Sequence, residues 1–146
     1  MASPSSRSVI IAAQPAEILS VIGDFARYPE WADSLRLCEV LTRHPDGTPD
    51  QVRFVIDAGM IQDDYVLAYS WDETRLRVGW ELVSGQLQRS QTGSFVLLPQ
   101  GAQTQVTYTL AVDLAVPLLS LFRRRAEQTI MDIALKLLKK RVEGGP

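Results

Sequence analysis

The sequence predicts an α+β domain in which an antiparallel sheet packs against one long C-terminal helix. From about Leu35 to Leu114, short segments alternate apolar and polar residues, and turn sequences separate them at intervals of roughly a dozen residues. This pattern is typical of an antiparallel meander. From Val116 the chain continues to Gly144 without a helix breaker beyond the first turn. Because 146 residues is a common size for one domain, we expect residues 1–146 to form a single domain.

The composition narrows the class of protein. Hydrophobic residues make up 46% and charged residues 22% of the chain, which is ordinary for a folded domain. The formal net charge is -2, so no global basic field favours nucleic acid as a partner. The N-terminus is polar, and no apolar run approaches the roughly 20 residues that span a bilayer. We therefore expect a cytoplasmic protein without stable membrane insertion.

A strand and two short helices are expected at the N-terminus. The apolar run from Val9 to Ala13 predicts the strand, and Pro15 suits the first turn of the first helix. Apolar residues three and four apart give this helix one buried face, and Gly23 ends or bends it. A second short helix is expected over Tyr28 to Ser34. Two large aromatics lie beside a proline there, so at least one ring should be anchored in the core.

Six strands follow, with turns expected at residues 45–49, 61–63, 72–74, 84–85 and 99–102. One face of these strands is apolar or aromatic, and it carries Val52, Phe54, Ile56, Ala58, Tyr65, Leu67, Tyr69, Trp71, Leu76, Val78, Trp80, Leu82, Val106, Tyr108, Leu110 and Val112. The opposite face is mixed, as expected where one side of a sheet meets water, and it carries Arg53, Asp57, Arg77, Glu81, Thr107, Thr109 and Asp113.

The C-terminal helix is long enough to cross the whole domain. At about 1.5 Å per residue it spans roughly 40 Å. Its apolar positions predict one inward stripe, made of Leu119, Phe122, Ala126, Ile130, Ile133 and Leu137. We therefore expect an amphipathic helix to lie across the apolar face of the sheet.

Three local sequences recur in this order in a known superfamily: residues 11–17 (IAAQPAE), residues 24–31 (DFARYPEW), and Val106-Thr107-Tyr108 before a long final helix. With the order of elements, they make the chain resemble the helix-grip superfamily, which includes START domains, the Bet v 1 allergens and bacterial polyketide cyclase/dehydrase-like (SRPBCC) proteins. The resemblance covers nearly the whole chain. It implies a curved seven-stranded antiparallel sheet around the last helix, with the helix pair closing the sheet's bend.

A cavity is expected between sheet and helix, because a strongly curved sheet and a straight helix touch poorly along their middle. The alternative is that aromatic side chains fill this space and leave no room for a ligand. The residues expected to line a ligand-binding cavity are Trp31, Phe54, Ile56, Tyr65, Tyr69, Trp71, Trp80, Phe95, Tyr108, Phe122, Ala126, Ile130 and Ile133.

The sequence offers little material for catalysis, and no catalytic residue is assigned. His44, the only histidine, falls in a turn and is interpreted as a solvated loop residue, whereas Cys38, the only cysteine, is interpreted as an apolar filler. Neither a phosphate-binding loop nor zinc-ligand spacing occurs, so we expect no metal and no cofactor. Asp63 and Asp64 fall at a predicted hairpin turn, and Asp64 is the carboxylate expected nearest the rim of the cavity.

The C-terminal helix is basic. Residues 117–146 contain seven basic and three acidic side chains. Lysines and arginines near the helix end are favoured by its dipole, but the triplet Arg123, Arg124 and Arg125 lies near the start, where cations are disfavoured. The triplet is interpreted either as a solvated face paired with local acids or as a contact for an anionic head group, a lipid surface or RNA.

Three functions remain open at this point. The first is a noncatalytic carrier or sensor of a small hydrophobic molecule of the lipid, polyketide or isoprenoid class, acting as a monomer or homodimer. The second is a polyketide cyclase/aromatase or dehydratase, in which Tyr65, Tyr69 and Tyr108 would orient the substrate. The third is an interaction protein, resembling the ribosome-associated or quinone-chaperone members of the superfamily.

Overall fold

The computed structural model describes residues 4–58, 61–115 and 120–144. Its elements, in chain order, are β1 (Ser5–Ile11), α1 (Pro15–Ile22), the 3-10 helix η1 (Phe25–Glu30), β2 (Leu35–Val40), β3 (Gln51–Ala58), β4 (Ile61–Trp71), β5 (Arg77–Gly85), β6 (Gln88–Gln100), β7 (Gln103–Leu114) and α2 (Ser120–Gly144). The predicted α+β class and the predicted order of elements are confirmed.

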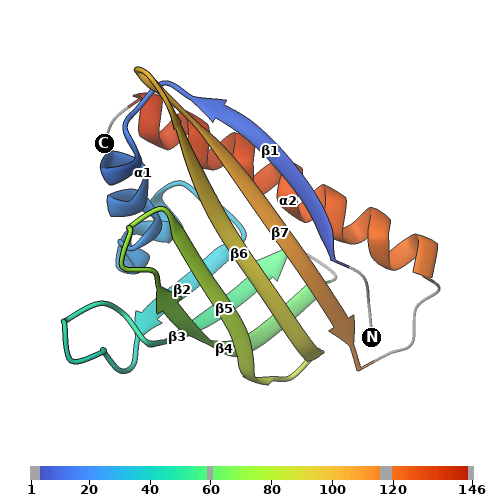
Figure 1. Cartoon of the computed structure of the whole chain (residues 1–146). Coiled ribbons are helices and arrows are strands. Elements are labelled where there is room, and N and C mark those ends of the chain that lie inside the picture. The colour runs from blue at the N-terminus through green and yellow to red at the C-terminus, as the bar shows by residue number, and fades with distance from the viewer. Residues whose placement is uncertain (1–3, 59–60, 116–119, 145–146) are drawn as a thin grey trace.

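The seven strands form one antiparallel sheet in the order β1-β7-β6-β5-β4-β3-β2. In Figure 1 the strands β2, β3 and β4 run at a steep angle to β6 and β7, so the sheet is strongly curved. Irregular register in β2, in β4 and near the start of β6 accompanies this curvature. The concave face carries the buried apolar residues predicted for it, including Val52, Leu67 and Val78.

Helix α2 lies along the concave face, behind β7 and β1 as Figure 1 is viewed. It packs mainly against β1 and β7 and also contacts α1. Polar bonds tie it to the beginning of the chain: Arg7 Nε pairs with Asp132 Oδ1 at 3.2 Å, and the Ala12 N–H donates to Glu143 Oε2 at 2.8 Å. The first strand and the last helix therefore fix each other in place.

The inward stripe predicted for this helix is wrong for Phe122 and Ile133, whereas Ala126, Ile130 and Leu137 lie along the edge of the space between helix and sheet. Phe122, Ile130 and Ile133 are 53%, 47% and 54% exposed, whereas the buried face consists of Glu127, Met131, Leu135 and Leu138. At 3.6 residues per turn the two sets lie on different sides of the helix. Leu119, the remaining N-terminal member of the predicted stripe, lies outside the described residues.

Three other element boundaries differ from the prediction. Strand β1 begins at Ser5 because polar residues extend it along β7, where the hydroxyls of Ser6 and Ser8 bond to those of Thr109 and Thr107. The second short helix begins earlier, at Phe25. The turn expected at residues 61–63 belongs to β4 instead, since Asp63 pairs with Ile56.

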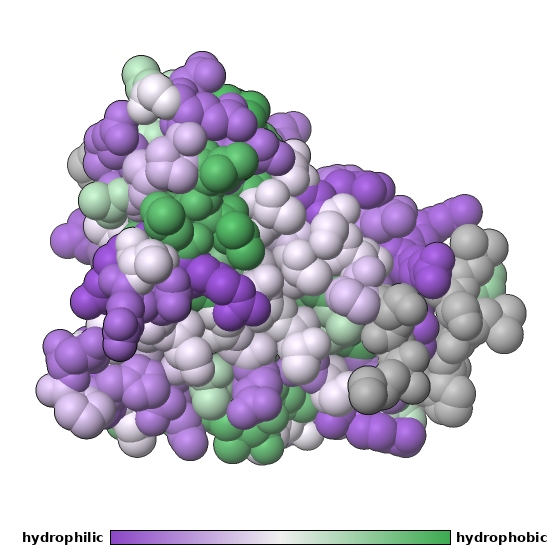
Figure 2. All heavy atoms as spheres, in the orientation of Figure 1, coloured by the Kyte–Doolittle hydropathy of each residue, from purple (hydrophilic) through white to green (hydrophobic). Residues whose placement is uncertain are grey.

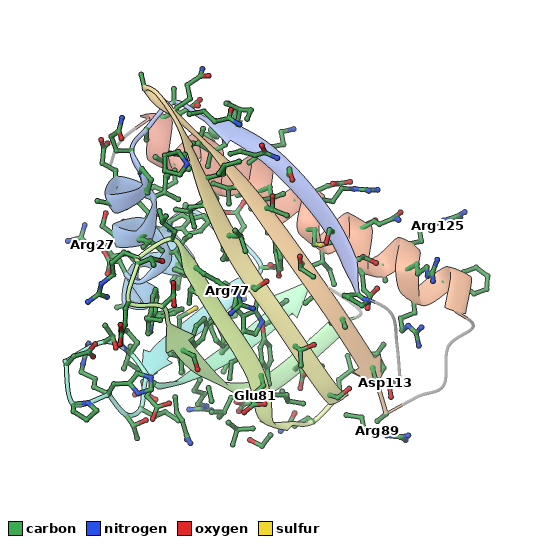
Figure 3. The ribbon with its side chains drawn as sticks, viewed as in Figure 1. Arg27, Arg77, Glu81, Arg89, Asp113 and Arg125 are labelled. Atoms are coloured by element: carbon green, nitrogen blue, oxygen red, sulfur yellow. The ribbon has the colours of Figure 1, made fainter. Side chains whose placement is uncertain are left out.

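The convex face of the sheet carries the mixed polar set that the alternation predicts. Figure 3 shows Arg77 and Glu81 along β5 and Asp113 near the end of β7, on the side turned away from α2. Figure 2 shows that this side is mostly hydrophilic or neutral, with one apolar patch beside α1 and a second at the opposite end of the strands. The apolar interior of the protein therefore lies on the concave side of the sheet.

Candidate functional site

The concave side encloses an inner chamber of about 160 Å³ between the sheet, η1 and the C-terminal half of α2. It is lined almost entirely by apolar and aromatic side chains: Ile22, Tyr28, Trp31, Ala32, Leu35, Phe54, Tyr65, Leu67, Tyr69, Trp80, Gln91, Phe95, Tyr108, Ala134, Leu137 and Leu138. Small Ala134 leaves room where the helix faces the middle of the sheet. The structure thus keeps a space that the aromatic rings do not fill.

A second, outer chamber of about 360 Å³ lies between β3, β4, β6, β7 and the first half of α2. Its lining is Ile56, Asp63, Tyr65, Leu87, Gln88, Gln91, Tyr108, Leu110, Val112, Leu114, Arg123, Ala126, Glu127 and Ile130. Tyr65, Gln91 and Tyr108 border both chambers. These three side chains therefore lie between the two chambers.

Aromatic rings give the inner chamber its shape. Phe95 lies between Trp80 and Tyr108, with ring centroids 5.3 Å and 4.6 Å away, and Tyr65 stacks on Phe54 at 5.2 Å. The Trp80 indole lies directly over Gly93 of the neighbouring strand, where a β-carbon would come within 2.6 Å of the indole nitrogen. Glycine is therefore needed at position 93 to seat this ring.

Three tyrosine hydroxyls of the chamber have no hydrogen-bond partner among residues 4–58, 61–115 and 120–144: those of Tyr65, Tyr69 and Tyr108. Tyr28 differs, because its hydroxyl donates to the Ile22 carbonyl. Burial raises the pKa of Tyr65 and Tyr108 above the usual value of 10.0, so both remain neutral phenols at physiological pH. Each can donate a hydrogen bond to a ligand oxygen.

One wall of the site is a chain of hydrogen bonds. Trp80 Nε1 donates to Gln91 Oε1 at 2.8 Å, Gln91 donates in turn to Gln88, and Gln88 Nε2 donates to Asp63 Oδ2 at 3.1 Å. Each amide is thereby held in one orientation. The wall is a fixed polar surface and not a set of free ligand contacts.

The two buried carboxylates of the outer chamber serve the fold. Asp63 Oδ1 accepts the backbone N–H groups of Asp64, Gln86 and Leu87 at 2.8–3.0 Å. Glu127 Oε1 accepts from Ser5 Oγ at 2.9 Å, and Oε2 accepts from the Val112 N–H at 2.7 Å. Because these oxygens already accept hydrogen bonds from the chain, neither group is placed as an unengaged general base.

Arg123 is a further polar group of the outer chamber that has an unmet hydrogen bond, and its Nε is the buried one. Its Nε atom is buried and has no hydrogen-bond partner in the described part of the chain. A buried N–H without an acceptor is costly, and a guanidinium group most readily accepts an oxygen-rich partner. Arg123 therefore offers a donor to whatever occupies the entrance.

The structure brings together ten of the thirteen residues expected to line the cavity. Trp31, Phe54, Tyr69, Trp80 and Phe95 line the inner chamber, Ile56, Ala126 and Ile130 line the outer one, and Tyr65 and Tyr108 line both. The other three line neither chamber, which corrects the expectation for them: Phe122 and Ile133 lie on the exposed side of α2, and Trp71 donates its indole N–H to the Pro49 carbonyl beside α1.

Two further sequence expectations need correction. Asp64 points away from the cavity and pairs with Arg53 at 2.7 Å, which lowers its pKa, whereas neighbouring Asp63 lines the outer chamber. His44 is half-buried and not simply solvated, because its Nε2 bonds to the Tyr69 carbonyl oxygen at 2.7 Å. Cys38 is buried as expected, and burial raises the pKa of its thiol to about 12.

The polar members of the site were not predicted from the sequence. Gln88, Gln91 and Glu127 are inward-facing exceptions to the apolar pattern, so hydrophobic periodicity does not detect them. Arg123 is named from the sequence only as part of the basic triplet, and not as a residue of the cavity. Among the described residues no group of three His, Cys, Asp or Glu side chains is arranged to hold a metal ion. Within the same part of the chain, the helices lack the combination of length and apolar character needed to span a membrane.

The fold and the cavity together define a helix-grip protein of the START/Bet v 1-like SRPBCC superfamily, with a mainly apolar internal space. Over residues 5–143 the chain matches the family described as polyketide cyclase/dehydrase and lipid transport, and it belongs to that family. Membership supports hydrophobic-ligand binding or polyketide cyclisation as the general function. No curated protein matches the chain significantly.

Solved structures agree with this assignment. The chain is similar to a START superfamily protein from Mycobacterium smegmatis, with 25% identity, a TM-score of 0.90 and 97% of each chain covered. It also resembles a protein from Thermus thermophilus, with 24% identity, a TM-score of 0.79, and 96% of this chain and 97% of the other covered. For the Zhui aromatase/cyclase from a Streptomyces species, identity is 14%, the TM-score 0.80, and coverage 98% and 94%. The last two likenesses show the fold alone.

Proposed function

We propose that the protein binds and carries a small hydrophobic molecule, whose apolar body occupies the inner chamber and whose oxygen-bearing end faces the entrance. The observation that carries this proposal is the pair of unpartnered phenols, Tyr65 and Tyr108, between the two chambers. Both residues line the chambers, and neither hydroxyl bonds to another group in the described chain, so both are available to a ligand oxygen.

The two ends of the site favour an amphipathic ligand. The inner chamber is lined by aromatic and aliphatic groups, whereas the outer one adds the unpartnered Arg123 guanidinium. A carbonyl or hydroxyl oxygen bound by Tyr65 and Tyr108, with a further oxygen at Arg123, would give these three donors acceptors. Lipids, polyketides and isoprenoids with an oxidised end all meet this description.

Catalysis of the aromatase/cyclase type is the second candidate. Neutral phenols and a guanidinium group would polarise ligand carbonyls, which favours enolisation and ring closure. Such a reaction also requires a base, and Asp63 and Glu127 are both engaged by donors of the chain itself. The geometry therefore supports binding better than turnover.

The proposal is tested by native mass spectrometry of the freshly purified protein, followed by organic extraction of any bound molecule. A stoichiometric hydrophobic compound with an oxygenated end is the expected result. Ala134→Phe should abolish its retention, because the new ring would occupy the inner chamber. Phe122→Ala is the matched control and should retain the compound, since this side chain is 53% exposed and lines neither chamber.

The variant Arg123→Gln tests whether the oxygen-bearing end of the ligand binds at Arg123 while the apolar end binds elsewhere. This variant should bind a long-chain carboxylic acid or ketone more weakly but should bind the corresponding alkane with unchanged affinity. A protein that arrives empty and also fails to bind fluorescent hydrophobic probes would overturn the carrier proposal. A bound compound that loses water during incubation with the protein would favour the cyclase or dehydratase instead.

A further inference from the structure

One side of α2 is apolar, exposed and continuous with the entrance of the cavity. Phe122, Ala126, Ile130, Ile133 and Leu137, here called the α2 ridge, fall within an arc of roughly 80° at 3.6 residues per turn. Three of them are large and half-exposed, at 53% for Phe122, 47% for Ile130 and 54% for Ile133. Three apolar side chains aligned on one helix are more than the single exposed residues common on protein surfaces.

The ridge is also part of the rim of the cavity. Ala126 and Ile130 line the outer chamber, and Leu137 lines the inner one. Apolar surface therefore runs without interruption from the inside of the protein to the outer side of α2. An apolar molecule that moved along this path would avoid contact with water over most of it.

Cationic side chains border the ridge on the side away from the cavity. Arg125 and Lys136 lie roughly 60° and 40° beyond Phe122 around the helix, Lys140 lies in line with Phe122 at that edge of the ridge, and all three are exposed. They have no ion pair within the part of the chain that the structure describes, unlike Lys139, which pairs with Glu143, and Arg141, which pairs with Glu30. Figure 3 shows Arg125 projecting outward from the first half of α2.

We propose that the α2 ridge and its three cations dock the protein on the surface of an anionic lipid membrane, with the cavity entrance facing the lipid. An apolar stripe bordered by lysine and arginine is the arrangement with which a helix lies in a membrane interface. The long cationic side chains extend to the head groups while the apolar ones enter the acyl boundary. A second copy of the chain is a poor occupant, because pairing two ridges would bring cations against cations.

This inference rests on the proposed function for its purpose, since docking would let a hydrophobic ligand pass between bilayer and cavity. Its physical basis is independent, however, because the ridge and the cations exist whether or not the chambers hold a ligand. The two proposals can therefore fail separately, and the experiment measures each by itself.

The test is flotation of the full chain with vesicles of phosphatidylcholine alone and of phosphatidylcholine mixed with phosphatidylglycerol. Binding is expected only to the mixed vesicles, and added salt should weaken it. Replacing Arg125, Lys136 and Lys140 together by Gln should lower the partition coefficient on the order of 100-fold, since each cation contributes about fivefold near an anionic surface. Replacing Phe122 and Ile133 together by Ser should lower it at least about tenfold.

Matched controls come from the convex face. Val83 and Leu98 are 50% and 55% exposed, close to the values for the ridge, and lie on the side of the sheet away from α2. Replacing both by Ser, or Arg77 and Arg89 by Gln, should leave vesicle binding unchanged. Equal losses of vesicle binding in the ridge and control variants would overturn the proposal. So would a parent protein that does not bind mixed vesicles at low salt, and that result would leave an acidic protein as the partner of this surface.

Ligand binding is measured in the same samples with a fluorescent naphthalene probe before vesicles are added. The ridge variants should retain probe binding, which also shows that they are folded. Vesicle binding without probe binding in the parent protein would sustain the docking surface and contradict the carrier function. The reverse result would sustain the carrier and contradict the docking surface.

Discussion

At the scale of single residues, Asp63 and Asp64 show how adjacent positions of a strand take opposite roles. Successive side chains of a strand point to opposite faces of the sheet. Asp63 points inward and accepts three backbone N–H groups, whereas Asp64 points outward and forms an exposed pair with Arg53. The alternation that places Tyr65 and Leu67 inward also places Asp63 inward, once β4 is extended back to Ile61. The turn expected at residues 61–63 interrupts that alternation, and this is why Asp64 is the carboxylate expected at the rim.

The first prediction concerns this pair. Asp63→Ala should lower the free energy of unfolding by about 2–4 kcal/mol, because three backbone N–H groups lose their acceptor in a buried place. Asp64→Ala should cost much less, since the pair it breaks is partly exposed. Urea unfolding followed by circular dichroism measures both. Equal losses would show that the inward carboxylate is not the acceptor described.

The second prediction concerns the phenols. Tyr65→Phe and Tyr108→Phe should each weaken binding of an oxygenated ligand several-fold, corresponding to about 0.5–1.5 kcal/mol for one hydrogen bond. Folding stability should be unchanged or slightly raised, because neither hydroxyl has a partner in the described chain that its removal would strand. Titration calorimetry with the extracted ligand gives the affinity, and thermal unfolding gives the stability. Unchanged affinity in both variants would remove the phenols from the site.

At the scale of elements, helix α2 shows why the inward face predicted from the sequence differs from the observed one. Its sequence contains two apolar sets, the mainly exposed ridge and an inward set made of buried Met131, Leu135 and Leu138 and partly buried Val142. Hydrophobic periodicity fits both sets equally well, and the buried one also includes charged Glu127. Only the partners of Glu127, the Val112 N–H and the Ser5 hydroxyl, make that face the inward one. Those partners come from distant strands and leave no signal in the helix sequence.

The third prediction concerns the pairing of β5 with β6. Gly93→Ala should destabilise the protein by about 1–3 kcal/mol and weaken ligand binding, because the new methyl group would displace the Trp80 ring that lines the inner chamber. Gly79→Ala is the control on the neighbouring strand, where the nearest atom, Arg77 Nη1, lies 3.4 Å from the new carbon. Thermal unfolding and ligand titration measure the two effects. Similar behaviour of both variants would argue against the close seating of Trp80.

At the scale of the whole molecule, the sequence predicts the architecture well and the site in part. The period-two pattern places aromatic residues such as Phe54, Tyr69 and Trp80 correctly on the concave face, because these side chains belong to the buried core. It does not predict how much space those rings leave. The volume depends on rotamers and on the depth of α2, which a pattern of polar and apolar letters does not encode.

The fourth prediction concerns the pH dependence of stability. It depends on all four tyrosines and Cys38. Burial raises the pKa of Tyr28, Tyr65, Tyr69 and Tyr108 above 10.0 and that of Cys38 from 9.0 to about 12. Since the unfolded chain releases these protons at lower pH than the folded one, stability should be unaffected below about pH 9 and fall as the pH rises beyond it.

Ultraviolet absorbance of phenolate provides the measurement for this fourth prediction. The signal should appear in one cooperative step that coincides with the loss of circular dichroism, because the phenols ionise only as the protein unfolds. Phenolate that forms gradually near pH 10 while the circular dichroism stays native would show that the tyrosines are accessible to solvent in the folded protein.

The bonds between β1 and α2 also bear on how the protein is made. Arg7 and Ala12 bond to residues more than a hundred positions later, so the sheet gains its last support only when α2 has been synthesised. A nascent chain lacking that helix would expose the aromatic concave face during translation, since contacts so distant in sequence form late. The helix that closes the concave face therefore also leaves that face uncovered until synthesis is nearly complete, and we expect the unfinished chain to need protection from aggregation.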